Sequence, residues 1–291
     1  MPRPTRPILI AALLLVAAAC APAPSSGETL GPDFVSGLGR ADLILRYGPP
    51  APALADLYLP GVPNGAAIIY VHGGAWVTGS RRDLPEAVKR TVTRGFTVLS
   101  IDYRLARPPA TIDDGVADVM TALRWLQANG AAWSVDPARI VLWGHSSGAH
   151  LATLTALDST SVEPGAAGLV SVSSPVDIAD LRASSAVNRL VIDTAIGATV
   201  DLEATLSRLD PRTQVSAVAP PIYVAAGDLD QLVPWSRHGL PLVMAWASAR
   251  GGSGVTYDLV HSGSDRARGH RIEGGINISE LDRFLARVTR T

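Results

Sequence analysis

A serine stands between two glycines in the stretch Gly144 to Gly148, which reads Gly-His-Ser-Ser-Gly. A serine hydroxyl is a weak nucleophile, so acyl transfer needs it exposed beside a base and beside donors that bind an oxyanion. The G-x-S-x-G pattern meets the first need, because glycines have no side chains to block a sharp strand-to-helix turn. We therefore take Ser146 as the candidate nucleophile.

The residues on either side predict the strand and the helix that such a turn requires. An apolar run, Ile140 to Trp143, precedes the turn, and a helical pattern starts at Ala149. The first amides of that helix and the positive end of its dipole point toward the serine. The pattern alone is weakly specific in a chain with 27 glycines, and this context makes it a strong candidate.

Three aspartates are candidates for the acid that would support a base. On such a turn the acid and the histidine follow the nucleophile in that order along the chain. Asp228 and Asp230 come directly after the apolar run Ile222 to Ala226, which predicts the next-to-last strand. Asp177 follows the preceding strand, and we expect it to cap the segment after it instead.

For the base the sequence offers two histidines after the last predicted strand, Val255 to Val260. His261 follows the strand directly, so the alternation of the strand fixes its direction. His270 ends a segment containing glycine and serine, 262–269, which can carry it over the carboxyl edge of the sheet. We predict that His270 rather than His261 comes within hydrogen-bonding reach of Ser146.

The other histidines have structural interpretations. His145 and His150 flank Ser146 too closely in sequence to reach back as its base, and we expect them to fill the surroundings of the turn. His238 lies in a predicted helix, where we expect it at the surface or with satisfied hydrogen bonds. The six histidines form no H-x-x-x-H or Cys/His pattern, so the sequence implies no metal and no cofactor.

The elements that must position these residues alternate between strand and helix. Continuous apolar runs predict strands at 67–71, 97–101, 140–143, 168–172, 222–226 and 255–260. Helical spacing predicts helices at about 83–94, 112–129, 235–250 and 278–288. This alternation predicts an α/β fold with a doubly wound, mainly parallel sheet and helices on both faces.

Two further segments complete the predicted fold. The runs 43–47 and 55–59 suit a pair of edge strands. Ser173 to Pro211 is irregular with weak helical patterning, and we interpret it as a small lid inserted over the site. We place a single catalytic domain at 42–291, because 291 residues with 47% hydrophobic content can bury a substantial core. A net charge of -1 without a basic stripe argues against nucleic-acid binding.

The first residues are typical of an export signal. Arg3 and Arg6 precede the apolar run Ile8 to Ala19, which is too short to span a bilayer comfortably. The single cysteine, Cys20, follows directly and resembles the lipidated cysteine of a bacterial lipobox, although alanine replaces the usual leucine three residues before it. We expect residues 1–20 to be a signal with a lipobox and 21–41 to be a flexible tether, which gives a lipid-anchored envelope protein. The alternative is ordinary secretion, into the periplasm or beyond.

Several motifs in the same order resemble the α/β-hydrolases of the esterase/lipase group, from about residue 43 onward. The nearer likeness is to the HGGxW carboxylesterases, which are feruloyl-esterase-like and related to hormone-sensitive lipase. The matching stretches read ADLYLP at 55–60, HGGAW at 72–76, DYRL at 102–105, and DPARI at 136–140 running into the serine motif. Because several ordered motifs are far more specific than one, this resemblance supports the α/β-hydrolase fold.

The resemblance also implies roles for the HGGAW stretch. The oxyanion donors would be the backbone amides of Gly74, Ala75 and Ser147, since such donors stabilise the tetrahedral intermediate. His72 would shape the loop as a structural residue and not serve as a base. Trp76 either walls the acyl pocket or only packs, and the sequence leaves both interpretations open.

The resemblance favours Asp230 as the acid, because the family pattern is glycine, two residues, aspartate and then Val-Pro. Gly269-His270 likewise resembles the family's Gly-His step before the last helix. The implied function is a serine carboxylesterase that hydrolyses small carboxylic esters through an acyl-enzyme, with Ser146 as nucleophile. One alternative is an arylformamidase-like amide hydrolase, because HGGxW occurs there too. Another is a catalytically silent binding lipoprotein, which the presence of all three triad residue types disfavours.

No other partner follows from the sequence. We expect a small-molecule ester as substrate, membrane contact only through the N-terminal lipid anchor, and no nucleic acid. The oligomeric state stays open, as does the identity of the ester or amide.

Overall fold

The computed structural model describes residues 41–49, 53–161, 163–261, 269–272 and 274–290. The predicted signal at 1–20 with Cys20, all but the last residue of the predicted tether, and residues 262–268 of the segment before His270 lie outside this range. Among the described helices, none is both long and apolar enough to cross a membrane.

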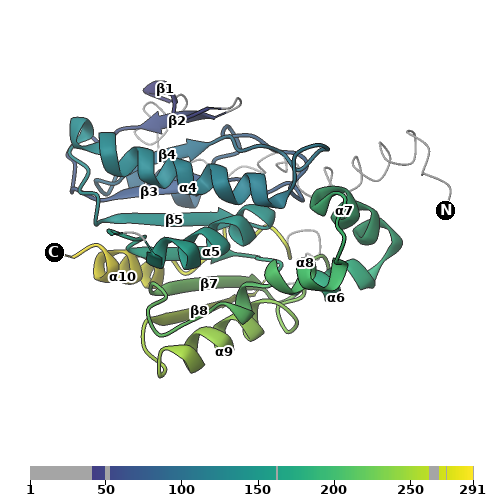
Figure 1. Ribbon diagram of the computed structural model, residues 1–291. Coiled ribbons are helices and arrows are strands. Elements are labelled where there is room, and N and C mark those ends of the chain that lie inside the picture. The colour runs from purple at the N-terminus through teal and green to yellow at the C-terminus, as the bar shows by residue number, and fades with distance from the viewer. Residues whose placement is uncertain (1–40, 50–52, 162, 262–268, 273, 291) are drawn as a thin grey trace.

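The described residues form one eight-stranded sheet in the order β1-β2-β4-β3-β5-β6-β7-β8 (Figure 1). The strands are β1 Leu43–Arg46, β2 Leu54–Tyr58, β3 Ala67–Val71, β4 Thr97–Ile101, β5 Ile140–His145, β6 Gly168–Val172, β7 Ile222–Gly227 and β8 Val255–Val260. All neighbours from β4 to β8 are parallel, and β2 is antiparallel to both β1 and β4. The predicted mainly parallel sheet is therefore confirmed.

The prediction of two edge strands needs one correction. β1 and β2 do pair, but β2 lies between β1 and β4, so of these two strands only β1 is at an edge of the sheet. β2 is buried over its last four residues, where its apolar side chains pack into the core and Asp56 pairs with buried Arg81 at 2.6 Å. An acidic residue in this strand therefore reflects a buried ion pair and not an exposed edge.

Helices cover both faces of the sheet, as predicted. α4 Ile112–Asn129, α5 Ser147–Asp158 and α9 Gly239–Ala249 pack into one apolar core, and α3 Glu86–Val92 and α10 Ile278–Val288 pack into a second core on the opposite face. In Figure 1, α4 and α5 lie in front of the sheet. Thr111 starts α4 with a capping box to Asp114, which satisfies two backbone donors of the first turn.

The segment after β6 is more regular than predicted. It forms α6 Ile178–Ser184, α7 Ala186–Ile196 and α8 Leu202–Arg208, which gather beyond one end of the strands (Figure 1). The side chains of Asp177, Ser185 and Asp201 cap these helices. Helices of 7, 11 and 7 residues give little periodic signal, and their caps supply much of what starts them. Short 3-10 helices complete the fold at Gly130–Trp133, Ser159–Ser161 and Pro211–Thr213.

Candidate active site

Ser146 lies at the tip of a tight turn between β5 and α5. Its backbone has φ 53° and ψ -125°, a left-handed conformation that costs free energy for a residue with a side chain. The neighbouring glycines permit this turn, because a Cβ on Gly144 would collide with the Gly148 carbonyl and one on Gly148 with the Val71 carbonyl. The G-x-S-x-G spacing is therefore dictated by close backbone approach, and it presents the Ser146 hydroxyl at the carboxyl edge of the sheet.

The structure brings Ser146, His270 and Asp230 together in one hydrogen-bonded chain. His270 Nε2 lies 2.9 Å from Ser146 Oγ, and His270 Nδ1 lies 2.7 Å from Asp230 Oδ2. All three residues are buried. Since the carboxylate can only accept, Nδ1 carries the imidazole proton and Nε2 is left to accept from the serine hydroxyl. This arrangement can remove the serine proton as the hydroxyl attacks a carbonyl.

Backbone contacts fix the acid and the base in place. Asp230 Oδ1 accepts from the amides of Leu232 at 2.9 Å and Val233 at 2.8 Å, so the carboxylate is held on both oxygens. A Cβ on Gly227 would collide with the carbonyl of Gly269, so the loop after β7 and the residue before His270 touch where only glycine fits. These contacts place the acid beside the base.

Two side chains that the sequence did not single out for this purpose hold the backbone of His270. His145 Nε2 and Ser173 Oγ each lie 3.1 Å from the His270 carbonyl oxygen. His145 thus fills the surroundings of the turn, as expected, and also supports the base. The only sequence signal for Ser173 was its position directly after a buried strand.

The rejected candidates lie elsewhere. His261 pairs with Asp228, with 3.0 Å between Nδ1 and Oδ2, and its side chain is 80% exposed. Within the described ranges no hydrogen bond joins His261 or Asp228 to Ser146. Asp177 accepts from the amide of Asp180 and caps α6, which agrees with the expected capping role.

The HGGAW loop follows β3 and runs past Ser146. Gly74, Ala75 and Trp76 all have positive φ, of 127°, 52° and 65°. A Cβ on Gly73 would lie 3.2 Å from Ser146 Cβ, so the loop passes against the serine. Among the described residues, no hydrogen bond occupies the amides of Gly74, Ala75 or Ser147. These amides are therefore available as donors, and Ala75 and Ser147 line the same cleft as Ser146.

A largely apolar cleft opens over Ser146. One wall of the cleft includes Ala75, Trp76, Ser147 and His270, and Gly74 does not line it. The opposite wall comes from the segment after β6 and the loop after β7: Pro175, Leu181, Asn188, Val191, Ile192, Leu232 and Val233. The insertion thus borders the site, as a lid should, and Trp76 both lines the cleft and packs in the core.

Three other histidines are buried and uncharged. His72 stacks on Tyr103 with ring centroids 4.3 Å apart, and its Nδ1 lies 2.8 Å from the Gly73 carbonyl, which fits the expected structural role. Burial lowers the pKa of His72, and it lowers the pKa of both His150 and His238 to about 4. All three are therefore neutral at pH 7.

The prediction for His238 was wrong in part. His238 stands just before α9 and is buried, not at the surface. Its Nδ1 accepts from the amides of Val176 and Asp177 at 3.3 Å, while Nε2 has no hydrogen-bond partner among the described residues. The side chain thereby holds the start of the insertion, a long-range contact that no local pattern reveals.

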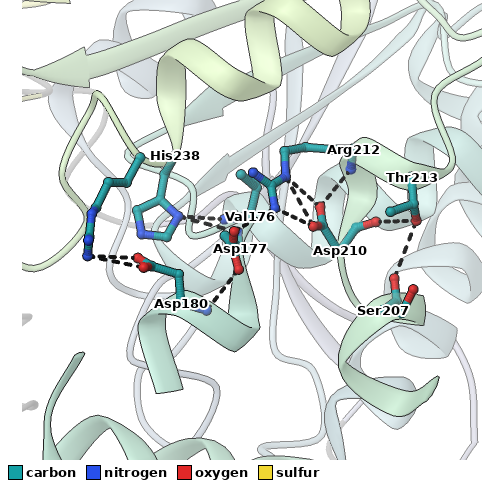
Figure 2. Close-up of polar contacts among 9 residues, drawn as sticks. Val176, Asp177, Asp180, Ser207, Asp210, Arg212, Thr213 and His238 are labelled. Carbon is teal, nitrogen blue, oxygen red and sulfur yellow. Dashed lines mark hydrogen bonds and ion pairs between the residues drawn. The ribbon is translucent and has the colours of Figure 1, made fainter. Parts of the chain in front are cut away.

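The two ends of the insertion meet in what we call the neck cluster, formed by Asp177, Asp210, Arg212 and His238 (Figure 2). Arg212 pairs with Asp177 at 2.7 Å and also with Asp210. Asp177 and Asp210 flank the three helices of the insertion, so one guanidinium joins both ends. The paired carboxylates raise the pKa of Arg212, which keeps this link charged.

Fold and site together define an α/β-hydrolase with a serine, histidine and aspartate at the carboxyl edge of its sheet. The chain belongs to the BD-FAE family, whose model matches residues 55–240. Solved structures share the fold. A truncated carbohydrate esterase from gut microbiota matches 84% of the chain and 95% of its own length at 22% identity, with a TM-score of 0.71. An esterase of Thermogutta terrifontis, Est2, matches with a TM-score of 0.66 at 20% identity, over 84% of this chain and 94% of its own.

Relatives in sequence include esterase LipQ of Mycobacterium tuberculosis, 30% identical over 57% of this chain and 42% of LipQ. The probable carboxylic ester hydrolase LipM of the same organism is 32% identical over 62% of this chain and 44% of LipM. The matched region spans less than half the length of these two relatives.

Proposed function

We propose that this protein is a serine carboxylesterase that hydrolyses small carboxylic esters through an acyl-enzyme. The observation that carries the proposal is the chain of two hydrogen bonds, 2.9 Å and 2.7 Å long, from Ser146 through His270 to Asp230. Its Ser146 end lines an apolar cleft, which Ala75 and Ser147, residues with unoccupied backbone amides, also line. The names of the relatives, esterase and carboxylic ester hydrolase, support the same chemistry.

The reaction follows from these positions. Ser146 Oγ attacks the ester carbonyl while its proton passes to His270 Nε2, and Asp230 stabilises the imidazolium that forms. The amides of Ala75 and Ser147, together with that of Gly74, receive the oxyanion. His270 then gives the proton to the leaving alcohol, and water repeats the sequence to release the acid. The apolar walls from α6 and α7 suit the hydrocarbon part of an acyl group.

Hydrolysis of p-nitrophenyl acetate and butyrate by the chain lacking residues 1–20 tests this proposal. We expect ester turnover with labelling of Ser146 by an organophosphonate, and little turnover of N-formylkynurenine on the same preparation. Faster turnover of the formamide would favour the amide hydrolase. No labelling and no turnover would favour a silent binding lipoprotein, which the assembled site disfavours.

We also propose that the protein is exported and lipid-anchored through Cys20, on the sequence pattern alone. Cys20→Ser should release the protein from membranes, because the thioether-linked lipid would be the anchor. If the wild-type protein is already free of membranes and unlipidated by mass spectrometry, simple secretion is the correct interpretation.

A further inference from the structure

His150 is a buried residue that the proposed reaction does not use directly. It lies on α5, one turn after Ser146. Its Nδ1 accepts from the indole N–H of Trp76 at 3.2 Å, and its Nε2 lies 2.7 Å from the carbonyl oxygen of Leu209. The Trp76 and His150 rings meet edge to face, with centroids 5.5 Å apart. A single imidazole thus joins three segments that are distant in sequence.

The two partners of His150 fix its protonation state. An indole N–H can only donate, so Nδ1 must be bare, and a carbonyl can only accept, so Nε2 must carry the proton. The neutral ring satisfies both contacts at once, and burial favours that form. Loss of either contact would leave a buried polar group without a partner, which destabilises the fold.

Trp76 belongs to the loop that offers the oxyanion donors. Ala75 and Trp76 both have positive φ, although neither is glycine. Such residues keep that conformation only where their surroundings hold it. The Trp76 carbonyl is held by the amide of Ala106 at 2.8 Å, and its indole is held by His150. Other hydrogen bonds hold the neighbouring residues of this loop, and the bond to His150 is the one that holds the Trp76 side chain.

Leu209 belongs to the other end of the connection. It is buried and immediately precedes Asp210, whose carboxylate binds Arg212 in the neck cluster (Figure 2). The neck cluster thus holds the Leu209 carbonyl at a fixed place against α5. His150 therefore contacts both the end of the insertion, at Leu209, and the HGGAW loop, at Trp76. Residues of α6 and α7 in the same insertion line the cleft.

We propose that His150 is a positioning residue that acts through Trp76 to align the oxyanion donors and that ties this loop to the end of the insertion. The inference rests on the proposed esterase function of Ser146. His150 does not line the cleft over Ser146, so we expect its effect to pass through the amides at 74–75. It should alter turnover while leaving ground-state binding of the ester nearly unchanged.

Two substitutions separate the two contacts. In His150→Asn the amide oxygen can take the place of Nδ1 and keep the bond from Trp76, whereas in His150→Gln the amide nitrogen can take the place of Nε2 and keep only the bond to Leu209. Both should lower the melting temperature. Only His150→Gln should lower kcat, by roughly 10- to 100-fold, which is less than the loss of a whole donor, with KM changed by less than about threefold.

Trp76→Phe removes the same bond from the other side and should lower kcat to a similar extent. Combined with His150→Gln it should cause little further loss, because one interaction cannot be removed twice. The affinity of a trifluoromethyl ketone, whose adduct with Ser146 places an oxyanion in the same hole, should fall in parallel with kcat/KM. Trp133→Phe is the matched control, since Trp133 lies before β5 at the opposite end of the sheet, and it should leave kcat unchanged.

The inference is overturned if Trp76→Phe retains kcat and inhibitor affinity within about twofold of wild type, or if the two substitutions lower kcat additively. Trp76→Phe decides the matter alone should His150→Gln not fold. Equal losses of kcat in His150→Asn and His150→Gln would also overturn it, because a merely structural role predicts no difference between them. A wild-type protein that neither hydrolyses p-nitrophenyl butyrate nor is labelled at Ser146 would instead refute the proposed function, and this inference with it.

Discussion

Two histidine–aspartate pairs connect the loops that follow β7 and β8. His270 and Asp230 are 2.7 Å apart, with side chains 6% and 1% exposed, and His261 and Asp228 are 3.0 Å apart, with side chains 80% and 25% exposed. The pairs have the same residue types and nearly the same separation. Only the buried pair reaches Ser146.

The supporting contacts, and not the pair itself, make a histidine a candidate base. Asp230 is held by two backbone amides, and the His270 carbonyl is bound by His145 and Ser173. Near the surface, water competes for the His261–Asp228 contact, which can contribute little. A histidine is a useful base only where its orientation is fixed relative to the nucleophile.

The largest expected effect is that of Ser146→Ala, because the buried pair is useless without the hydroxyl that it serves. Turnover of p-nitrophenyl butyrate should fall by roughly 10⁴- to 10⁶-fold, as when a serine protease loses its nucleophile. The melting temperature should change little, since the hydroxyl contributes little packing. Organophosphonate labelling at any serine other than Ser146, followed by peptide mass spectrometry, would contradict the assignment.

Replacement of each histidine tests the comparison directly. His270→Ala should lower kcat by several orders of magnitude, up to about the loss in Ser146→Ala, because base and nucleophile act as one unit. His261→Ala is the matched control and should keep kcat within about twofold. A large loss in the control, or near-normal turnover of His270→Ala, would mean that the exposed pair supplies the base.

Replacement of Asp230 should lower kcat more than replacement of Asp228, by a smaller factor than separates the two histidine variants. Asp230→Asn should lower kcat by about 10⁴-fold, because a neutral amide no longer stabilises the imidazolium or its tautomer. Asp228→Asn should leave kcat nearly unchanged when assayed beside it. The reverse ranking would assign the acid to Asp228.

Much of the fold could be predicted because parallel strands buried on both faces read as continuous apolar runs. The strands at 67–71, 97–101 and 168–172 and the helix at 112–129 have the predicted bounds. Helix starts were less accurate, with α9 beginning at Gly239 rather than at about 235, because propensity does not fix a helix end. The insertion was missed as helical because its short helices depend on individual caps.

The site residues also differ in how far they could be predicted from local sequence. Ser146 could be found from local sequence, because the glycines and the strand that make its turn are neighbours along the chain. The choice of His270 over His261 depended on how far a loop can reach. The choice of Asp230 over Asp228 depended on the resemblance to a known family. The supports Ser173, His150 and His238 depend on contacts across at least 59 residues, which periodicity cannot detect.

His238 is buried like His270, but in the part of the chain that the structure describes its ring makes no hydrogen bond to a carboxylate. Burial lowers the pKa of His238 to about 4, against the opposing effect of Asp180, Asp177 and Asp230. Between pH 6.5 and 4, His238 is protonated in the unfolded chain but stays neutral in the folded protein. The contribution of His238 to the free energy of unfolding is therefore fully present above pH 6.5 and is lost as the pH falls toward 4.

Urea unfolding should show that the free energy of unfolding decreases between pH 6.5 and 4. In His238→Asn this decrease should be smaller by on the order of 1 to 3 kcal/mol, since asparagine keeps an acceptor but does not titrate. His150, with a similarly low pKa, should preserve part of the slope in the variant. An identical pH dependence in both proteins would show that His238 is not held neutral by the fold.

The exposed pair carries the smallest expected effect. A double-mutant cycle with His261→Gln and Asp228→Asn isolates the interaction between the two side chains, because effects that each residue has elsewhere cancel. With His261 80% exposed, the coupling at pH 7 should be at most about 1 kcal/mol in urea unfolding. The same cycle measured on kcat should give no coupling. A coupling of several kcal/mol, or a tenfold effect on turnover, would mean that exposure does not distinguish the two pairs and that the exposed pair takes part in the reaction.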